Sequence, residues 1–218
     1  MTLPKHCGMP ALTCNIKGLR AHAVLNNGFG SVDVDVSVRK WRSWLVHCLV
    51  KSSRHYNEAR NIIYLQLAEA DVSNGGVQNG RVLHIIDFPL AIEDCITSIV
   101  KLNVCLKALE QKVELLAGFS NTLKNEKLLI GKLRDKLEHM HNQIACGQTG
   151  NGPIFLVLNE SGNSIKLLAL EISFLSLHAV LEHMYAAVAG LFSDFNAASP
   201  VEPSGALVLS MSVQITQT

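Results

Sequence analysis

The chain has 218 residues, of which 48% are hydrophobic and 17% are charged, and its formal net charge is +1. This length suits one domain with additions, and a charged share below the roughly 25% of an average soluble domain excludes a disordered or highly charged protein. The near-neutral balance argues against nucleic-acid binding by bulk charge. An aromatic share of only 6% argues against a base-stacking platform like that of single-strand-binding proteins.

The ends of the chain and its cysteines indicate a cytoplasmic protein. Residues 1–22 lack a basic start followed by a continuous apolar core, so no signal peptide is expected. Charged residues and histidines interrupt the most apolar stretch, residues 165–192, which therefore predicts a buried helix and no membrane partner. Six scattered cysteines are interpreted as reduced core residues rather than as disulfides: Cys7, Cys14, Cys48, Cys95, Cys105 and Cys146.

The first part of the chain predicts a strand and then a long helix. Residues 1–39 are interpreted as an N-terminal extension, with turn-forming residues over 1–30 and one strand over 31–38, where valine occupies every second position. From about Lys40 to Asp71 the apolar residues recur at helical spacing, and a glycine-rich loop follows.

Two further helices are expected in the middle of the chain. A second helix is predicted from about Asp87 to Leu116, with Pro89 in its first turn, where the missing amide costs nothing. A third is predicted from about Thr122 to Ala145, after a break at 118–121.

The last part of the chain predicts a hairpin, a helix and a strand. Residues 154–170 have hairpin composition, a fourth helix spans about Ile172 to Phe192, and the tail, 194–218, ends in an alternating strand over 207–215. The predicted fold class is mainly α: an up-down four-helix bundle over residues 40–193 with a small antiparallel β-sheet or hairpin as decoration.

Several enzyme classes leave no signature in the chain. There is no glycine-rich phosphate loop, no nucleophile elbow and no His-Glu-x-x-His zinc motif. Two sets of potential metal ligands fit no known spacing: His6, Cys7, Cys14 and His22, and Glu171, His178 and Glu182. We therefore expect no metal and no cofactor.

The string Leu-Arg-Asp-Lys-Leu-Glu-His places Arg134 and His139 on the predicted third helix, separated by four residues. It resembles the Arg-x4–6-His motif of the HEPN superfamily, whose members are small helical bundles. The polar Asp135 after the arginine and the Lys136–His139 string are also similar to that family, as is the order of helices. The resemblance covers about residues 40–192.

The resemblance implies a metal-independent endoribonuclease that acts as a homodimer, with one Arg/His pair from each subunit in a shared cleft. An imidazole titrates near neutral pH and serves as general base or acid, while a guanidinium holds phosphate oxygens. RNA supplies the 2′-hydroxyl nucleophile, so cleavage leaves a 2′,3′-cyclic phosphate and DNA resists. The resemblance further implies a toxin or antiviral defence effector, controlled by a cognate antitoxin or another regulatory protein.

Helical geometry places the candidate catalytic residues off the predicted core. Arg134 and His139 lie about 140° apart around a helix, with His139 away from the apolar stripe and Arg134 at its flank. Auxiliary or RNA-binding roles are expected for Asp135, Glu138, His141, Lys132 and Lys136, with Lys124 and Lys127 as further contacts. Some toxin members of the family carry a modified tyrosine two positions after the histidine; here that position is His141, so this regulation is not expected.

Other interpretations remain open on the sequence. Arg134–His139 also fits a solvated helix face in which Asp135 pairs with His139, and a second match, Arg42–His47, is interpreted as structural. The HEPN superfamily includes non-catalytic members, so the alternative function is a helical scaffold or interaction protein of the same fold. A third hypothesis is a small-ligand pocket formed by aromatic residues of the first long helix, although such stripes usually form core. These aromatic residues are Trp41, Trp44, Tyr56 and Tyr64.

Overall fold

The structure, a computed structural model, describes residues 6–29, 35–72, 87–192 and 194–196. Within them the chain is mainly helical, with a small three-stranded antiparallel sheet, which confirms the predicted mainly α class and its small antiparallel sheet. The elements are α1 (Ile16–Phe29), α2 (Val36–Val72), α3 (Asp87–Glu110), the 3-10 turn η1 (Glu114–Leu116), α4 (Lys124–Glu138), α5 (Met140–Ala145), β1 (Val157–Leu158), β2 (Ser164–Leu167), β3 (Leu170–Ser173) and α6 (Phe174–Ala189).

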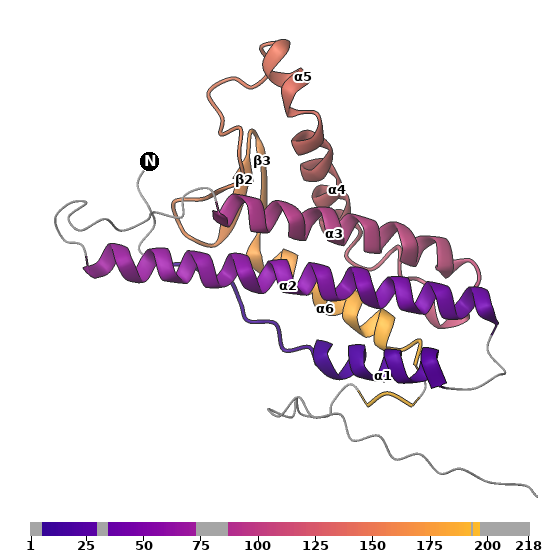
Figure 1. The fold of residues 1–218 in the computed structure, drawn as a ribbon. Coiled ribbons are helices and arrows are strands. Elements are labelled where there is room, and N and C mark those ends of the chain that lie inside the picture. Colours follow the sequence, from indigo (N-terminus) through magenta and orange to yellow (C-terminus); the bar gives the residue numbers. More distant parts are fainter. Residues whose placement is uncertain (1–5, 30–34, 73–86, 193, 197–218) are drawn as a thin grey trace, which may run out of the picture.

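The long helices α2 and α3 lie antiparallel and form the body of the fold (Figure 1). One stripe of α2 is buried, and its members recur every three or four residues as the helical period requires: Leu45, Leu49, Ser52, Tyr56, Ala59, Ile63 and Leu67. α3 buries Ile92, Ile96 and Ile99 along with later apolar residues of the same face. α1 and α6 also pack against α2 (Figure 1).

Helical structure begins earlier in the chain than the sequence predicts. The strand expected over residues 31–38 is wrong from residue 36 on, because α2 begins at Val36; residues 31–34 lie outside the described part of the chain. The carboxylate of Asp35 accepts hydrogen bonds from the backbone amides of Ser37 and Val38, at 2.7 and 3.3 Å. This is an N-cap, and together with packing it overrides the β propensity of alternating valines.

α1 occupies a segment for which the sequence predicts only turns. Asn15 precedes it and accepts a hydrogen bond from the amide of Gly18 at 2.8 Å. Leu19 and Ala23 are buried in the common core. The expected N-terminal extension is therefore part of the core of the fold.

Residues 6–15, here called the N-terminal strap, bind to one face of α2. The hydroxyls of Tyr56 and Tyr64 donate to the carbonyls of Pro10 and Cys7, each at 2.9 Å. Between them, Nε of Arg60 donates to the carbonyl of Met9 at 3.0 Å. Donors spaced by four residues on a helix lie in a row, so they match an extended segment that runs along it.

The strap also joins the sheet and α6 to this core. The amide of Gly8 donates to the carbonyl of Gly162, in the turn between β1 and β2, at 2.8 Å. Further along, Glu182 of α6 accepts from the amide and hydroxyl of Thr13, at 3.1 and 3.0 Å. The strap therefore holds three elements together that are far apart in sequence.

The other predicted boundaries shift by a few residues. The helix expected over 87–116 ends at Glu110, with η1 separate, and the third predicted helix is divided at His139 into α4 and α5. The hairpin is confirmed, but residues 170–173 add a third strand, so α6 starts at Phe174, where Ser173 accepts from the amide of Ser176 at 3.0 Å. The strand predicted over 207–215 lies outside the described residues.

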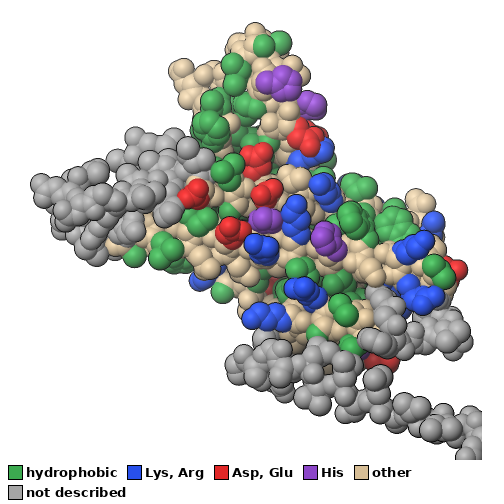
Figure 2. Space-filling view, in the orientation of Figure 1, with side chains coloured by type: hydrophobic (Ala, Val, Ile, Leu, Met, Phe, Trp, Pro, Cys, Tyr) green, Lys and Arg blue, Asp and Glu red, His purple; other side chains and the backbone are tan. Residues whose placement is uncertain are grey.

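α4 and α5 project from the α2–α3 body beside the sheet (Figure 1). Ile130 and Leu133 anchor α4 in the core, whereas α5 contributes no buried residue. Histidine and hydrophobic side chains are exposed on this projection (Figure 2). Among the described residues, no helix has a segment that is both long and apolar enough to cross a membrane.

Candidate functional site

The candidate catalytic residues lie in the outer half of α4, which holds Arg134, and at its end, where His139 follows. The helix begins at Lys124, after Leu123 has taken a left-handed conformation with φ of 50°. Ile130 and Leu133 face the core, so the side chains that follow at other angles around the helix, Arg134 among them, are partly or fully exposed.

The Arg134 guanidinium is paired with two carboxylates of its own helix. Nη2 forms an ion pair with Glu138 four residues on, and Nη1 lies 3.3 Å from Oδ1 of Asp135. The Arg134 side chain remains 32% exposed, so solvent or a ligand can still reach it. The positive charge of Arg134 is therefore already paired with carboxylates of the same chain.

His139 lies at the junction between the two helices of the projection. Its backbone amide donates to the carbonyl of Asp135 at 3.1 Å and so ends α4, while α5 starts at the next residue. The imidazole is exposed and makes no hydrogen bond or ion pair with any described residue. The alternative interpretation, in which Asp135 pairs with His139, is therefore wrong, because the Asp135 carboxylate contacts Arg134 instead.

The auxiliary residues differ in their environments. Lys136 donates to the side-chain carbonyl of Gln143 at 2.9 Å, a hydrogen bond that spans the junction of α4 and α5. Lys132 and His141 are exposed. Arg134, Asp135 and Glu138 thus form one connected group, whereas His139 lies beside it without a direct contact.

Lys127, expected as an RNA contact, is buried and only 4% exposed. Its ammonium donates to the carbonyl of Phe119 and lies 3.9 Å from the centre of the Phe119 ring. The ring of His183 stacks on the same phenylalanine at 5.0 Å. Burial lowers the pKa of Lys127, and burial together with the Lys127 charge lowers the pKa of His183. The cluster of Lys127, Phe119 and His183 therefore holds α4 against α6. Its role is structural, and the spacing of residues in the sequence did not reveal it.

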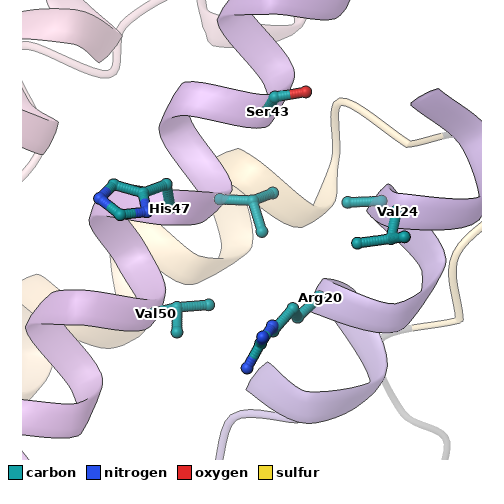
Figure 3. Close-up of a pocket in the computed structure, with 7 residues that line it drawn as sticks. Arg20, Val24, Ser43, His47 and Val50 are labelled. Carbon is teal, nitrogen blue, oxygen red and sulfur yellow. The ribbon is translucent and has the colours of Figure 1, made fainter. Parts of the chain in front are cut away.

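In the second Arg-x4-His match, Arg42–His47, both side chains lie against aromatic rings. The Arg42 guanidinium lies 5.5 Å from the centre of the Phe192 ring, and the His47 imidazole stacks on Trp44 at 5.3 Å. A hollow of about 330 Å³ lies between α1 and α2 next to His47 (Figure 3). Arg42 thus serves packing, as expected, while His47 remains exposed.

The aromatic residues proposed for a small-ligand pocket divide into two groups. Tyr56 and Tyr64 hold the N-terminal strap, and Tyr56 is fully buried. Trp44, in contrast, is 50% exposed. Tyr64 is also 39% exposed, but its hydroxyl is bonded to the strap, so the exposed residues of the stripe lie at its two ends and do not share one pocket.

Two residues considered as metal ligands form hydrogen bonds between α6 and the strap: Glu182 with Thr13, and His178 with the carbonyl of Ala11. Burial alone would raise the pKa of Glu182, but hydrogen bonds from Thr13 and Cys14 and the nearby His178 lower it. Burial and the bond to Glu182 raise the pKa of Cys14, so that it stays a thiol. In the part of the chain that the structure describes, no three His, Cys, Asp or Glu side chains lie close enough to hold a metal ion, and all six cysteines are unbridged.

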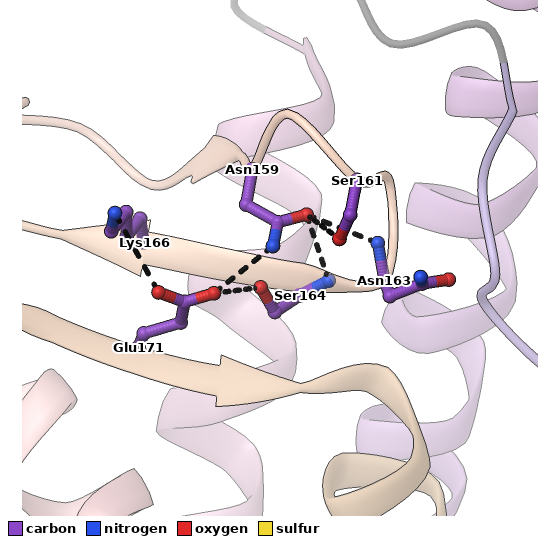
Figure 4. Close-up of polar contacts among 6 residues, drawn as sticks. All are labelled: Asn159, Ser161, Asn163, Ser164, Lys166 and Glu171. Atoms are coloured by element: carbon purple, nitrogen blue, oxygen red, sulfur yellow. Dashed lines mark hydrogen bonds and ion pairs between the residues drawn. The ribbon is translucent and has the colours of Figure 1, made fainter.

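Glu171 belongs to a polar network in the sheet (Figure 4). Its carboxylate accepts from Ser164 and from Nδ2 of Asn159, the latter at 3.0 Å, and pairs with Lys166 at 3.6 Å. These bonds, that of Ser164 first, lower its pKa. Asn159 in turn accepts from the amides of Asn163 and Ser164 and shapes the hairpin turn. Glu171 thus stabilises the hairpin.

Comparison with protein-family models, with curated proteins and with solved structures finds no match to this chain.

Proposed function

We propose that this protein is a metal-independent endoribonuclease that acts as a homodimer, with Arg134 and His139 as its catalytic residues. The observation that carries the proposal is the end of α4 at His139. It leaves an imidazole exposed, with no hydrogen bond or ion pair to any residue that the structure describes. A partly exposed guanidinium lies five positions earlier on the same projection, which contributes little to the core. These are the two groups that RNA cleavage by transesterification requires.

The proposed reaction uses the substrate's own nucleophile. The His139 imidazole takes the proton of a ribose 2′-hydroxyl, and the 2′-oxygen forms a bond to the adjacent phosphorus. The bond between phosphorus and the 5′-oxygen then breaks. His139 of a second copy donates a proton to that leaving oxygen, and a 2′,3′-cyclic phosphate remains.

Arg134 stabilises the negative charge on the phosphate during this step. Its guanidinium has five N–H donors, so a phosphate oxygen can replace the Asp135 or Glu138 carboxylate that it contacts in the free protein. Lys132 and His141 are exposed near the same end of α4 and would add phosphate contacts. Such an enzyme would act on cellular RNA in the cytoplasm as a toxin or antiviral effector, and a cognate antitoxin would control it.

The second candidate is a non-catalytic interaction protein of the same fold. Two observations favour it: Arg134 is compensated by carboxylates of its own helix, and large apolar side chains of the projecting region are exposed. The latter are Leu128, Ile144, Ile154 and Phe155. Because both candidates accommodate a dimer through this surface, the oligomeric state does not distinguish them.

Cleavage of total RNA in excess chelator distinguishes them. We expect the full-length protein to cleave and to leave cyclic phosphate ends, and Arg134→Ala and His139→Ala each to lower the rate by about 100-fold or more. His55→Ala, which removes an imidazole paired with Glu58 at 3.3 Å in α2, is the matched control and should cleave normally. Circular dichroism and size-exclusion chromatography with light scattering verify fold and assembly. No cleavage, or equal cleavage by all variants, would leave the interaction protein as the better candidate.

A further inference from the structure

Positive charge is concentrated in α1 and the first half of α2, although the whole chain is nearly neutral. The described residues from 6 to 57 include seven of the 19 Lys and Arg residues and one of the 18 Asp and Glu residues. The cations are Lys17, Arg20, Arg39, Lys40, Arg42, Lys51 and Arg54, and the carboxylate is Asp35. Lys and Arg side chains are visible along α2 and over α1, while most acidic side chains of this face lie nearer the other end of α2 (Figure 2). Such a distribution creates a local positive potential that attracts polyanions.

Both tryptophans of the chain lie in this region. Trp41 is half-buried, whereas Trp44 is 50% exposed. The indole of Trp44 is stacked on the imidazole of His47, with ring centres 5.3 Å apart and planes inclined by 21°. A half-exposed aromatic ring that is held flat by a neighbour offers a surface on which an unpaired base stacks.

Three adjoining hollows connect these groups along α2. The first, between α1 and α2, is lined by Arg20, Ser43 and His47 among apolar side chains (Figure 3). The second shares Ser43 and His47 with the first, and it shares Lys40 and Trp44 with the third. Arg39 also lines the second hollow. Together, Arg20, Arg39, Lys40, Trp44 and His47 define what we call the basic face.

The cations of the basic face are available to a ligand. Within the described residues, Arg20, Arg39 and Lys40 form no ion pair with a carboxylate, in contrast to Arg134. Asp35 lines the third hollow, where its carboxylate caps α2 by accepting from the amides of Ser37 and Val38. A phosphate at Arg39 or Lys40 therefore displaces no carboxylate among the residues that the structure describes.

We infer that the basic face binds single-stranded nucleic acid, with backbone phosphates on Arg20, Arg39 and Lys40 and one unpaired base stacked on Trp44. Three cations beside an exposed indole fit phosphates and a base at once. A duplex keeps its bases stacked away from the indole, and an acidic peptide would use the cations but not the ring. The inference holds whether or not the Arg134–His139 pair is catalytic, because it rests on other residues.

The test uses the full chain carrying His139→Ala, so that the probe is not cut. The probes are fluorescein-labelled oligouridylate and oligodeoxythymidylate of about 12 nucleotides, with a duplex of the same length and polyglutamate as comparisons. Fluorescence anisotropy measures affinity. Quenching of the intrinsic tryptophan emission reports stacking, because both tryptophans lie at the basic face.

We expect saturable binding of a single strand, weakened by salt, with tryptophan quenching. Trp44→Ala should weaken binding about tenfold and remove most of the quenching. The combined Arg39→Glu and Lys40→Glu variant should weaken binding further. Lys166→Glu, which reverses one charge on the sheet, should bind normally, and circular dichroism verifies that each variant is folded.

Four outcomes would overturn the inference: no saturable binding, binding without quenching, equal weakening by Lys166→Glu, or equally tight binding of duplex or polyglutamate. A preference between the two single strands would show whether the 2′-hydroxyl is read. Loss of RNA cleavage in the separate chelator assay would leave this result unchanged, so the two proposals fail independently.

Discussion

Gly162 provides a direct test of how the N-terminal strap is attached. It lies in the turn between β1 and β2 with φ of +72°, and its carbonyl accepts the amide of Gly8 at 2.8 Å. A Cβ at this position would be 1.9 Å from the carbonyl oxygen of His6 and 2.9 Å from its carbonyl carbon. Because these atoms are backbone, no side-chain rotation relieves the contact, and Gly162→Ala must displace the strap.

The expected loss of stability has three parts. An alanine at positive φ costs about 1 kcal/mol, and loss of the Gly8 hydrogen bond about 1 kcal/mol more. Partial exposure of Met9, which is 1% exposed in the strap, adds on the order of 1 kcal/mol. Gly162→Ala should therefore lower the free energy of unfolding by about 3 kcal/mol.

Gly150→Ala is the matched control. Its φ is +55°, and a Cβ there would have no atom within 4 Å, so only the backbone cost of about 1 kcal/mol should remain. Urea denaturation followed by circular dichroism measures both variants, and limited proteolysis should release the strap faster in Gly162→Ala alone. Equal destabilisation of the two variants would refute the close docking of the strap on this turn.

Three further predictions concern hydrogen bonds, pH and the site. Tyr56 is 0% and Tyr64 39% exposed, so water can replace the lost hydrogen bond only at Tyr64. Urea denaturation should show that Tyr56→Phe lowers the free energy of unfolding by about 1.5 kcal/mol and Tyr64→Phe by about 0.5 kcal/mol. Equal losses would contradict this. The pKa of His183 is lowered in the folded state, so the unfolded chain binds the proton more tightly. The contribution of His183 to the free energy of unfolding should thus be fully present above its ordinary pKa of 6.5 and be lost as the pH falls below that value. His183→Gln should reduce the loss of stability between about pH 7.5 and 5.5. An unchanged dependence of stability on pH would exclude this role. Glu138→Gln removes one of the two carboxylates paired with Arg134. Because this ion pair is exposed, the free energy of unfolding should change by less than about 0.5 kcal/mol, while the RNA cleavage rate should rise about twofold. A slower rate at unchanged stability would count against the idea that phosphate displaces Glu138.

Periodicity predicted the interiors of the helices because burial imposes it directly. The apolar stripes of α2, α3, α4 and α6 are visible in the sequence, and so is the hairpin. The division at His139 was not predicted, since the surrounding residues favour helix and include no proline or glycine. Leu133 is the last buried residue of α4 and α5 has none. Leu137 and Met140 contact the core but stay partly exposed, so packing favours a continuous helix only weakly here.

The candidate site shows the same limit. The spacing of Arg134 and His139 is local and was read from the sequence, but the pairing of Arg134 with Glu138 and the burial of Lys127 were not. The basic face was missed because overall charge and aromatic content are averages. They do not show that the described part of α1 and the first half of α2 carries seven Lys and Arg residues but only one carboxylate, with Trp44 half-exposed among them.

The sequence by itself thus determined the mainly helical class, the interiors of α2, α3, α4 and α6 and one candidate catalytic pair, all of which depend on residues within a few positions of each other. The tertiary structure alone decided the role of residues 6–15, the N-terminal strap. The carbonyls of Cys7, Met9 and Pro10 find their donors on α2, 46 to 57 positions away. Backbone groups must be satisfied when they are buried, but any side-chain donor serves, so no pattern in the sequence specifies which one does.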